Sequence, residues 1–324
     1  MKAIFVTRLE GPEGLELRDV EKPKPAPNQV LIRVAATSVN FADIKSTYGN
    51  YHNAGNPPFI PGLDAAGTIE AVGSEITNFK VGERVIGFPK NGSYAEYIVI
   101  EEPLVFSIPD SIDFETAAAC PTVSFTSYKL LADVARLEKG ETVLIHAAAG
   151  GIGTTAIQLA KILGAGKIIG AVSSLEKESV ALEVGADHVI TYDGFSGKVN
   201  ELTGGMGADV ILDSLAGEIT EESMLCLAPY GRLVNFGNAT GRAGQISSYD
   251  LHSSCRSILG FSLGTTRNKR PELLQSAAKT VLPLLAEGLL KMSISCQFSL
   301  GEATMAQAFV ESRRSTGKVI LTVS

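Results

Sequence analysis

The sequence predicts an α/β protein that combines a doubly wound parallel sheet with a second, mostly β domain. From about residue 122, short apolar strands alternate with helical stretches, which is the pattern of a parallel sheet covered by helices. A glycine-rich turn joins the first of these strands to the helix that follows it. Before residue 110, short apolar strands are separated by Gly, Pro and Asn. A chain of 324 residues is long enough for two such domains.

The individual elements follow from the apolar runs and the residues that flank them. N-terminal strands are expected at residues 1–6, 30–34, 67–72 and 94–99, with a proline-stiffened loop at 22–27. Central strands are expected at 142–147, 167–172, 188–192, 208–213, 231–236 and 257–261. The C-terminal part should contain a helix from Pro271 to about residue 287, a strand at 295–300, a helix at 302–313 and a strand at 318–323.

The glycine-rich turn has the spacing Ala147-x-x-Gly150-x-x-Gly153 and stands between a strand and a helix. Glycines let the backbone turn tightly and approach a ligand closely. The free N–H groups and positive dipole end of the new helix favour a phosphate. We therefore expect a dinucleotide to be bound by the residues of the turn, namely Ala149, Gly150, Gly151, Ile152 and Gly153.

The residues after the second central strand indicate which dinucleotide is bound. Enzymes that use NAD place Asp or Glu there, whereas this strand ends in Ser173 and Ser174. Hydroxyl groups can donate to a 2′-phosphate, and Lys177 can supply a compensating positive charge. These residues predict NADPH as the cofactor. The alternative for Lys177 is a solvated helix face, because Glu176 and Glu178 flank it.

Composition argues against several other classes of partner. The net charge is −7 and no long basic run occurs, which argues against nucleic acid or an anionic membrane as the main partner. The N-terminus lacks the pattern of a signal peptide, and no apolar run is long enough to span a bilayer. The cysteines are scattered, which suggests the reducing cytoplasm and neither a disulfide framework nor a structural zinc site: Cys120, Cys226, Cys255 and Cys296.

Three stretches of the N-terminal third resemble motifs of the medium-chain dehydrogenase/reductase superfamily. Pro61-Gly62-Leu63-Asp64-Ala65-Ala66-Gly67 resembles its Pro-Gly-x-Glu-x-x-Gly signature, with Asp64 in place of Glu. Val72-Gly73 with the stretch 79–85 resembles the next block, and Asn40 occupies the place of the first catalytic cysteine of zinc alcohol dehydrogenases. With the glycine turn, the resemblance covers essentially the whole chain. It is closest to the zinc-independent quinone oxidoreductases.

This resemblance implies a GroES-like catalytic domain, residues 1–121 with 264–324, and a Rossmann cofactor domain, residues 122–263. The C-terminal tail would then pack back on the N-terminal domain, with the active site in an interdomain cleft.

The residues present argue against a catalytic metal. Catalytic zinc needs three Cys, His or carboxylate ligands, whereas Asn40 and Leu63 occupy two of the ligand positions. The four-cysteine lobe of the zinc enzymes is absent after Pro89. No ligand spacing is seen among His52, His146, His188 and His252. His146 ends a buried strand and is expected to be a core residue.

The resemblance also implies further cofactor contacts. Tyr192 would lie near the 2′-phosphate, Phe236, Gly237 and Asn238 along the pyrophosphate and nicotinamide, and Phe261 to Leu263 at the carboxamide. Core packing alone would also explain Phe236 and Phe261. Thr316, with Arg313 and Ser315, would face the adenosine end, although a solvated basic pair explains Arg313 and Arg314 equally well.

Without zinc, the protein must position the cofactor and polarise the acceptor itself. The expected residues are Asn40 to orient the ribose or polarise a carbonyl, and Asp43 to anchor its loop. Tyr48 or Tyr51 would donate a proton or hydrogen bond, unless the loop 49–55 merely covers the pocket. Thr126 would lie near the nicotinamide.

These expectations define an NADPH-dependent, zinc-independent reductase of quinones. Within the same fold, an enone or enoyl-thioester reductase is the alternative. From a different class, a crystallin-like NADPH-binding protein with little turnover would retain the same glycines. The resemblance further implies a homodimer through the edge of the Rossmann sheet, where residues 257–263 are a plausible edge strand.

Overall fold

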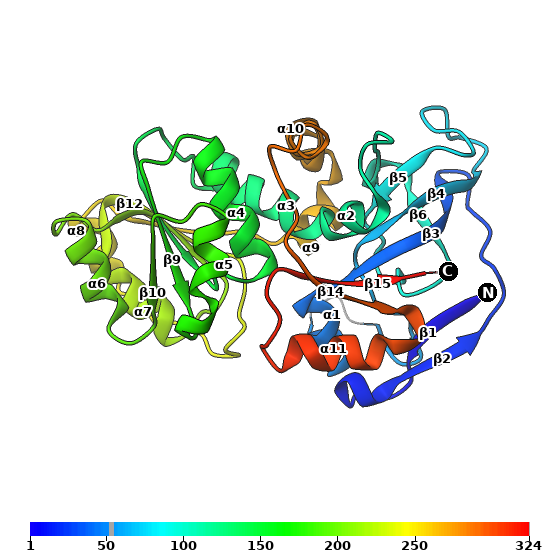
Figure 1. Ribbon diagram of the computed structural model, residues 1–324, viewed down its shortest axis with the longest axis horizontal. Coiled ribbons are helices and arrows are strands. Elements are labelled where there is room, and N and C mark those ends of the chain that lie inside the picture. Colours follow the sequence, from blue (N-terminus) through cyan, green and yellow to red (C-terminus); the bar gives the residue numbers. More distant parts are fainter. Residues whose placement is uncertain (52–54, 324) are drawn as a thin grey trace. The chain divides into compact units, whose positions relative to one another are not determined.

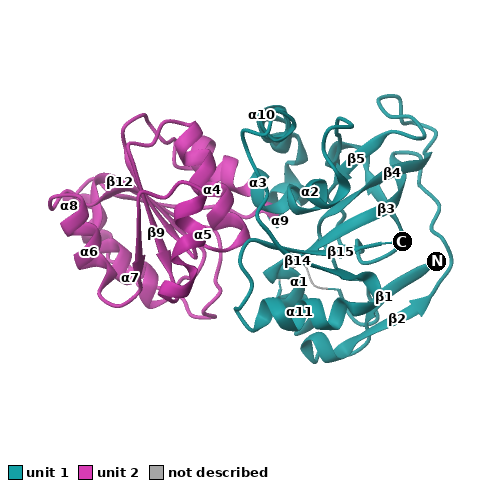
Figure 2. Ribbon diagram, viewed as in Figure 1, with its two compact units in different colours: residues 1–125, 264–324 teal, residues 126–263 magenta. Residues whose placement is uncertain are grey.

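The computed structural model describes residues 1–51 and 55–323 and confirms the expected fold class. The chain forms two compact units (Figure 1 and Figure 2). Unit 1 comprises Met1–Phe125 with Gly264–Ser324, and unit 2 comprises Thr126–Leu263. The boundaries fall within two helices, α3 (Pro121–Tyr128) and α9 (Leu263–Lys269).

Unit 2 is built on a six-stranded sheet in which every pairing is parallel. Numbered within the unit, the strands run in the order 3-2-1-4-5-6, which is the dinucleotide-binding order. All carboxyl ends of the strands therefore lie at one edge of this sheet. From one side to the other, the strands are β10 (His188–Thr191), β9 (Lys167–Val172), β8 (Thr142–His146), β11 (Ala208–Asp213), β12 (Leu227–Asn235) and β13 (Ser257–Gly260).

The central strands of unit 2 read as continuous apolar runs because the sheet is buried on both faces. Leu144 of β8 and Ile211 of β11 are fully buried, and Phe195 packs in the same cluster. The element η3 (Lys129–Val134) precedes the first strand. The helical elements between the strands are α4 (Gly151–Ile162), η4 (Leu175–Lys177), α5 (Glu178–Glu183), α6 (Phe195–Leu202), α7 (Glu218–Met224) and α8 (Ser248–Ser253).

Unit 1 contains a seven-stranded, mostly antiparallel sheet and a two-stranded ribbon of β1 (Lys2–Val6) and β2 (Leu15–Asp19). The C-terminal strand lies inside the sheet, where it pairs with β3 so that Val319 faces Val39. The order is β14 (Ile294–Ser299), β15 (Lys318–Thr322), β3 (Gln29–Val39), β4 (Ala65–Val72), β5 (Arg84–Gly87) and β7 (Val105–Ser107), with β6 (Tyr97–Glu101) also on β3.

The remaining helical elements of unit 1 are short except for α10. They are η1 (Gly11–Gly14), α1 (Phe41–Thr47), η2 (Glu102–Leu104), α2 (Phe114–Ala119), η5 (Pro271–Leu273), α10 (Leu274–Ala286), η6 (Leu300–Glu302) and α11 (Ala303–Glu311). Within the described ranges, no helix is both long and apolar enough to cross a bilayer.

Several elements differ from the sequence prediction, among them the strand expected from residue 94 and the helix expected from Pro271. The strand expected from residue 94 begins at Tyr97, because Tyr94 and Ala95 instead meet β1 through the Ile4 N–H and an isolated bridge to Ala3. Pro271 opens a 3₁₀ turn before α10 rather than the α-helix itself.

Candidate active site

The glycine-rich turn in unit 2 leads directly from β8 into α4. The Gly150 N–H donates to the Ala147 carbonyl (2.9 Å), and Thr154 N–H donates to Gly150 as the first helical bond (2.9 Å). The amides of Gly151, Ile152 and Gly153 therefore stand at the start of a twelve-residue helix, where amides have no intrahelical partner. This is the geometry that binds a phosphate.

Gly153 is required by close packing rather than by its backbone angle. A Cβ on Gly153 would lie 2.4 Å from the Ala147 carbonyl oxygen and 2.6 Å from the Ala148 Cα. Both contacts are with backbone, so no side-chain motion could relieve them. The missing side chain thus lets α4 start directly against β8, as the third glycine of a dinucleotide fingerprint does.

Tyr192, which directly follows β10, is hydrogen-bonded to the first residue of the glycine-rich turn. Its hydroxyl accepts from the Ala147 N–H (2.8 Å) and donates to the Ala171 carbonyl (3.3 Å). Ala147 has a positive φ of 51°, an uncommon angle for a residue with a side chain, so this support matters. Burial raises the pKa of Tyr192 well above its usual range, and the phenol stays protonated.

His146 confirms the expectation of a core histidine. Its side chain is buried, and Nε2 lies 2.9 Å from the Ser223 hydroxyl. Its ring stacks on Tyr192, with centroids 5.7 Å apart. Burial lowers the pKa of His146 to about 4, so the imidazole is neutral at physiological pH.

The residues after β9 form an open, polar corner beside the turn. Ser173 is exposed, while Ser174 and Lys177 are half-buried. The Lys177 N–H donates to the Ser174 carbonyl (3.1 Å), which fixes the short η4 turn at the strand end. Two hydroxyls and an ammonium group thus lie at the end of the second strand, which is the position that binds the ribose 2′-group in folds of this type.

The far strands bring their end residues to the same edge of the sheet. Gly237 follows β12 and approaches Ser214 so closely that a Cβ would lie 2.6 Å from its carbonyl oxygen. Phe236 directly follows β12, and its N–H donates to the Asp213 carbonyl at the end of β11. Phe261 directly follows β13, and its N–H donates to the Asn235 carbonyl at the end of β12. Two further predicted contacts lie just beyond, the exposed Asn238 and the half-buried Leu263.

Thr126 lies on α3 and is buried. The next residue, Ser127, donates its hydroxyl to the Ile152 carbonyl (3.3 Å), which ties this helix to the glycine turn. This bond of Ser127, one residue after Thr126, places α3 against the start of α4.

Asn40 of unit 1 is held on both sides of its side-chain amide. Its Nδ2 donates to Asp64 Oδ2 (2.8 Å), and its Oδ1 accepts from Lys318 Nζ (2.6 Å). The side chains of Asn40, Asp64 and Lys318 are all buried. Lys318 is the first residue of β15. The pairing of β15 with β3 places it there.

Asp43 anchors the start of α1, because its Oδ2 accepts from the Asn40 backbone N–H (2.8 Å). The Tyr94 hydroxyl lies 3.5 Å from the same oxygen. Burial raises the pKa of Asp43 to about 7, and the neighbouring Asp64 acts in the same direction. Asp43 is therefore a carboxyl that titrates near neutral pH.

The two candidate tyrosines of unit 1 lie in different surroundings. The Tyr48 ring covers Gly11, where a Cβ would lie 2.3 Å from the ring. A hydrogen bond to Glu311 raises the pKa of Tyr48. Tyr51 is half-buried and lies close enough to the buried Arg267 to raise the pKa of that guanidinium, against the lowering by burial.

Thr316 and His52 are the last two residues that the sequence analysis considered. Thr316 is half-buried and precedes β15 by two residues. His52 lies outside the described residues.

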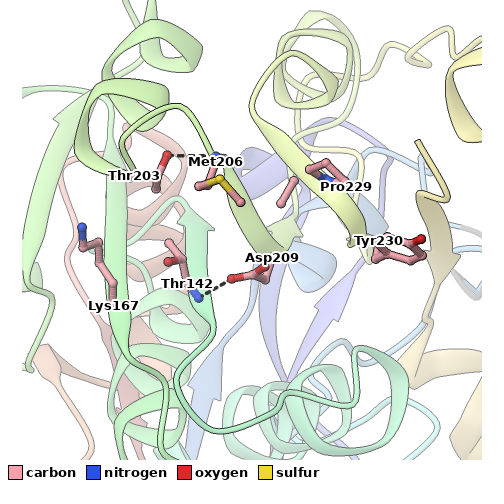
Figure 3. Close-up of a pocket in the computed structure, with 9 residues that line it drawn as sticks. Thr142, Lys167, Thr203, Met206, Asp209, Pro229 and Tyr230 are labelled. Atoms are coloured by element: carbon pink, nitrogen blue, oxygen red, sulfur yellow. Dashed lines mark hydrogen bonds between the residues drawn. The ribbon is translucent and has the colours of Figure 1, made fainter. Parts of the chain in front are cut away.

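One cavity of unit 2 lies away from this edge. It has a volume of about 550 Å³ and is lined by Thr142, Lys167, Asp209 and Tyr230, among others (Figure 3). Thr142 and Lys167 are the first residues of β8 and β9, so the cavity lies at the amino ends of the parallel strands. Ligands of such sheets bind at the carboxyl ends, so we do not place the active site here.

Comparison with known proteins gives matches along nearly the whole chain. The family model "Zinc-binding dehydrogenase" matches residues 151–279, and "Alcohol dehydrogenase GroES-like domain" matches residues 26–110. A quinone oxidoreductase of Pseudomonas aeruginosa is 40% identical over 99% of this chain and 99% of its own length. The human quinone oxidoreductase is 32% identical over 99% and 97%. The crystal structure of Escherichia coli quinone oxidoreductase complexed with NADPH superposes with a TM-score of 0.90, at 31% identity over 99% and 100% of the two chains.

These matches, with the two-unit fold and the dinucleotide-type turn, show that the chain belongs to the medium-chain dehydrogenase/reductase superfamily. Within it, the chain is an oxidoreductase of the quinone oxidoreductase subgroup.

The donors present do not fit the zinc that one family description names. At the position expected for a cysteine ligand, the Asn40 amide is already bonded to an ammonium and a carboxylate, and the neighbouring Leu63 offers only hydrocarbon. Over residues 1–51 and 55–323, no group of three or more His, Cys, Asp or Glu side chains is arranged to hold a metal. We derive no step through zinc.

Sequence reasoning missed the partners of Asn40. Asp64 was noted only as a variant of a motif, and Lys318 only as the first residue of a strand. An ionisable residue opening an otherwise apolar strand, in Lys318-Val319-Ile320-Leu321, is the signal that could have found it.

Proposed function

We propose that this protein is a zinc-independent, NADPH-dependent reductase of quinones. The observation that carries the proposal is the geometry at the carboxyl edge of the unit 2 sheet: the helix-start amides of α4 adjoin a strand end that carries hydroxyls and an ammonium group but no acid. The name of the Escherichia coli relative, which was solved with NADPH, supports the same cofactor.

The residues of unit 2 would hold the cofactor in parts. The amides of Gly151, Ile152 and Gly153 would bind the pyrophosphate. Ser173, Ser174 and Lys177 would bind the 2′-phosphate, with Tyr192 keeping the turn in place rather than reaching the ligand. Phe236, Gly237, Asn238, Phe261 and Leu263 would line the nicotinamide half, and Thr316 of unit 1 the adenosine end.

NADPH, when bound, supplies the hydride. The protein's task is to orient the acceptor and to stabilise the negative charge that develops on its oxygen. The side-chain amide of Asn40 and the hydroxyl of Thr126 are the donors we assign to this task. Of the two tyrosines, we assign proton donation to Tyr51, which lies close to the buried Arg267 guanidinium.

An activated alkene is the second candidate substrate. A relative named 2-haloacrylate reductase, from Burkholderia, is 32% identical over 98% of both chains. A quinone and an α,β-unsaturated carbonyl both accept hydride and leave negative charge on oxygen, so the same donors would serve either.

NADPH oxidation against a panel of acceptors tests the proposal. We expect consumption with 1,4-benzoquinone and 9,10-phenanthrenequinone, and less with an alkyl enone or 2-chloroacrylate. Faster turnover of the alkenes would replace the quinone by the second candidate. Binding of NADPH without consumption by any acceptor would contradict both, and would favour a crystallin-like role.

Lys177→Ala tests the choice of cofactor. Removing one ammonium from a phosphate site should weaken NADPH binding about tenfold, the scale of one charge-assisted hydrogen bond, and leave NADH unchanged. Lys198→Ala, a lysine on α6 that donates to Thr191, is the matched control. Equal loss for NADPH and NADH would contradict the assignment of Lys177.

We also propose that the protein is a cytoplasmic homodimer paired through the outer strand of the unit 2 sheet. β13 ends the strand order and exposes one unpaired edge within that sheet. Sedimentation of the wild type and of Ile258→Pro tests this pairing. We expect a dimer for the wild type and a monomer for Ile258→Pro, because proline removes an N–H from that strand. A monomeric wild type, or an unchanged dimer in the variant, would contradict the pairing.

A further inference from the structure

We propose that Lys318 and Asp64 form a buried positioning pair that sets which way the side-chain amide of Asn40 points. The inference rests on the proposed function for its consequence, since Asn40 is there assigned to the ligand. Its structural part stands on unit 1 alone. The pair is remote in sequence, because Asp64 and Lys318 are 254 positions apart.

Lys318 has the contacts of an ammonium ion. Its Nζ lies 2.6 Å from Asn40 Oδ1, 3.1 Å from the Val39 carbonyl oxygen and 3.5 Å from Asp64 Oδ2. Three oxygen acceptors match the three N–H groups of an ammonium, whereas a neutral amine has only two. The only charged partner among them is Asp64, which is fully buried.

Asp64 is surrounded by donors. Its Oδ2 accepts from Ser38 Oγ (2.7 Å) and from Asn40 Nδ2 (2.8 Å). Its Oδ1 accepts from the Thr122 N–H (2.9 Å) and hydroxyl (2.6 Å). A buried carboxylate needs such a set of donors, and because it only accepts hydrogen bonds, it cannot bond to an amide oxygen.

The consequence for Asn40 is a single allowed orientation. A flipped amide would turn its NH₂ group toward the Lys318 ammonium and its oxygen toward the Asp64 carboxylate. Both new contacts are repulsive, donor against donor and acceptor against acceptor. The observed orientation points Nδ2 at the Asp64 carboxylate and Oδ1 at the Lys318 ammonium, in a side chain that is only 7% exposed.

The same carboxylate also holds the first turn of α3, through the N–H and the hydroxyl of Thr122. Asp64 thereby fixes the first turn of the helix and the Asn40 amide together. Lys318 and Asp64 are positioning residues, because each acts through another group.

The test measures the amide directly and then its effect on turnover. In protein labelled with ¹⁵N-asparagine, the Asn40 side-chain amide should show one N–H protected from exchange with solvent. Lys318→Met, which keeps the chain length but removes the charge, should abolish that protection. In NADPH-dependent quinone reduction we expect kcat/KM to fall about 10–100-fold, with Asn40→Ala showing a similar loss and the double variant no further loss.

Two further variants keep the test decisive. If Lys318→Met leaves Asp64 uncompensated and fails to fold, Lys318→Met with Asp64→Asn removes both charges and should show the same loss of protection and turnover. Arg232→Met breaks a half-buried ion pair of unit 2, Arg232 with Glu141, and should lower stability without changing the Asn40 amide or kcat/KM.

The possible results separate the inference from the proposed function. An unchanged Asn40 amide in Lys318→Met would overturn the positioning pair. Additive losses in the double variant would show that Lys318 does not act through Asn40, which also overturns it. A wild type that consumes no NADPH would refute the proposed function, while the amide measurement would still decide the positioning pair.

Discussion

At the residue scale, Asp43 is a titratable group whose effect on folding can be predicted. The folded state raises its pKa to about 7 from an ordinary value of 3.8, mainly by burial. The folded protein therefore holds an extra proton between these two values. The resulting stability is present at low pH and is lost as the pH rises through 7.

Asp43→Asn should remove this pH dependence, because asparagine does not titrate and its oxygen can still accept from the Asn40 N–H. Relative to the wild type, we expect the variant to gain roughly 2–3 kcal/mol of unfolding free energy between pH 5 and pH 8, at about 1.4 kcal/mol per pKa unit. Urea unfolding at both pH values measures it. Comparing the two proteins at each pH cancels other groups, such as His146. An equal difference at both pH values would contradict the assignment.

How far the site could be predicted also differs from residue to residue. Asp43 lies three residues after Asn40, and its anchoring role follows from that short spacing. Lys318 could not be predicted as a partner of Asn40, because their contact depends on the register of β15 against β3. Tyr48 and Tyr51 looked equivalent in sequence, and only the packing of Tyr48 on Gly11 and its bond to Glu311 separate them.

At the scale of elements, the turn between β8 and α4 is the feature with the least freedom. Gly153→Ala would push a Cβ against the backbone of Ala147 and Ala148. We expect this variant to lose about 1–3 kcal/mol of stability, as overpacked sites do, and to bind NADPH at least tenfold more weakly. Thermal unfolding and NADPH titration measure the two effects.

Gly197→Ala is the matched control for that variant. Gly197 lies inside α6, where a new Cβ would meet nothing within 4 Å. Alanine should stabilise this helix by roughly 0.5–1 kcal/mol and leave NADPH binding unchanged. If both variants weakened NADPH binding equally, the effect at Gly153 would not be specific to the turn.

The strands of unit 2 were predicted well because buried parallel strands read as continuous apolar runs between glycine turns. Five of the six begin and end within about one residue of the expected ranges; β12 starts earlier, at Leu227. That strand contains Pro229, and Tyr230 has a positive φ of 63°, so sequence propensity gave no reason to extend it. In unit 2 the local pattern of apolar residues determines where the strands form, and tertiary contacts change only where a strand begins or ends.

At the scale of the whole molecule, the C-terminal strand β15 returns to the sheet formed by the N-terminal part of the chain. This strand lies between β14 and β3, and it supplies Lys318 from its first residue. A chain that ends at Gly317 would lack an interior strand of the unit 1 sheet. We expect it to be insoluble or to lose cooperative unfolding, as judged by circular dichroism and thermal melts. Native-like melting of the shortened chain would contradict this role of β15.

The central claim is that the protein transfers hydride from NADPH to a quinone with its own donors and without zinc. The most direct test is kcat/KM for 9,10-phenanthrenequinone, with NADPH and with NADH, on enzyme dialysed against a chelator and checked for metal by mass spectrometry. We predict undiminished activity in the metal-free enzyme and at least a tenfold preference for NADPH. Loss of activity on chelation that returns with added zinc, or equal use of NADH, would contradict the account.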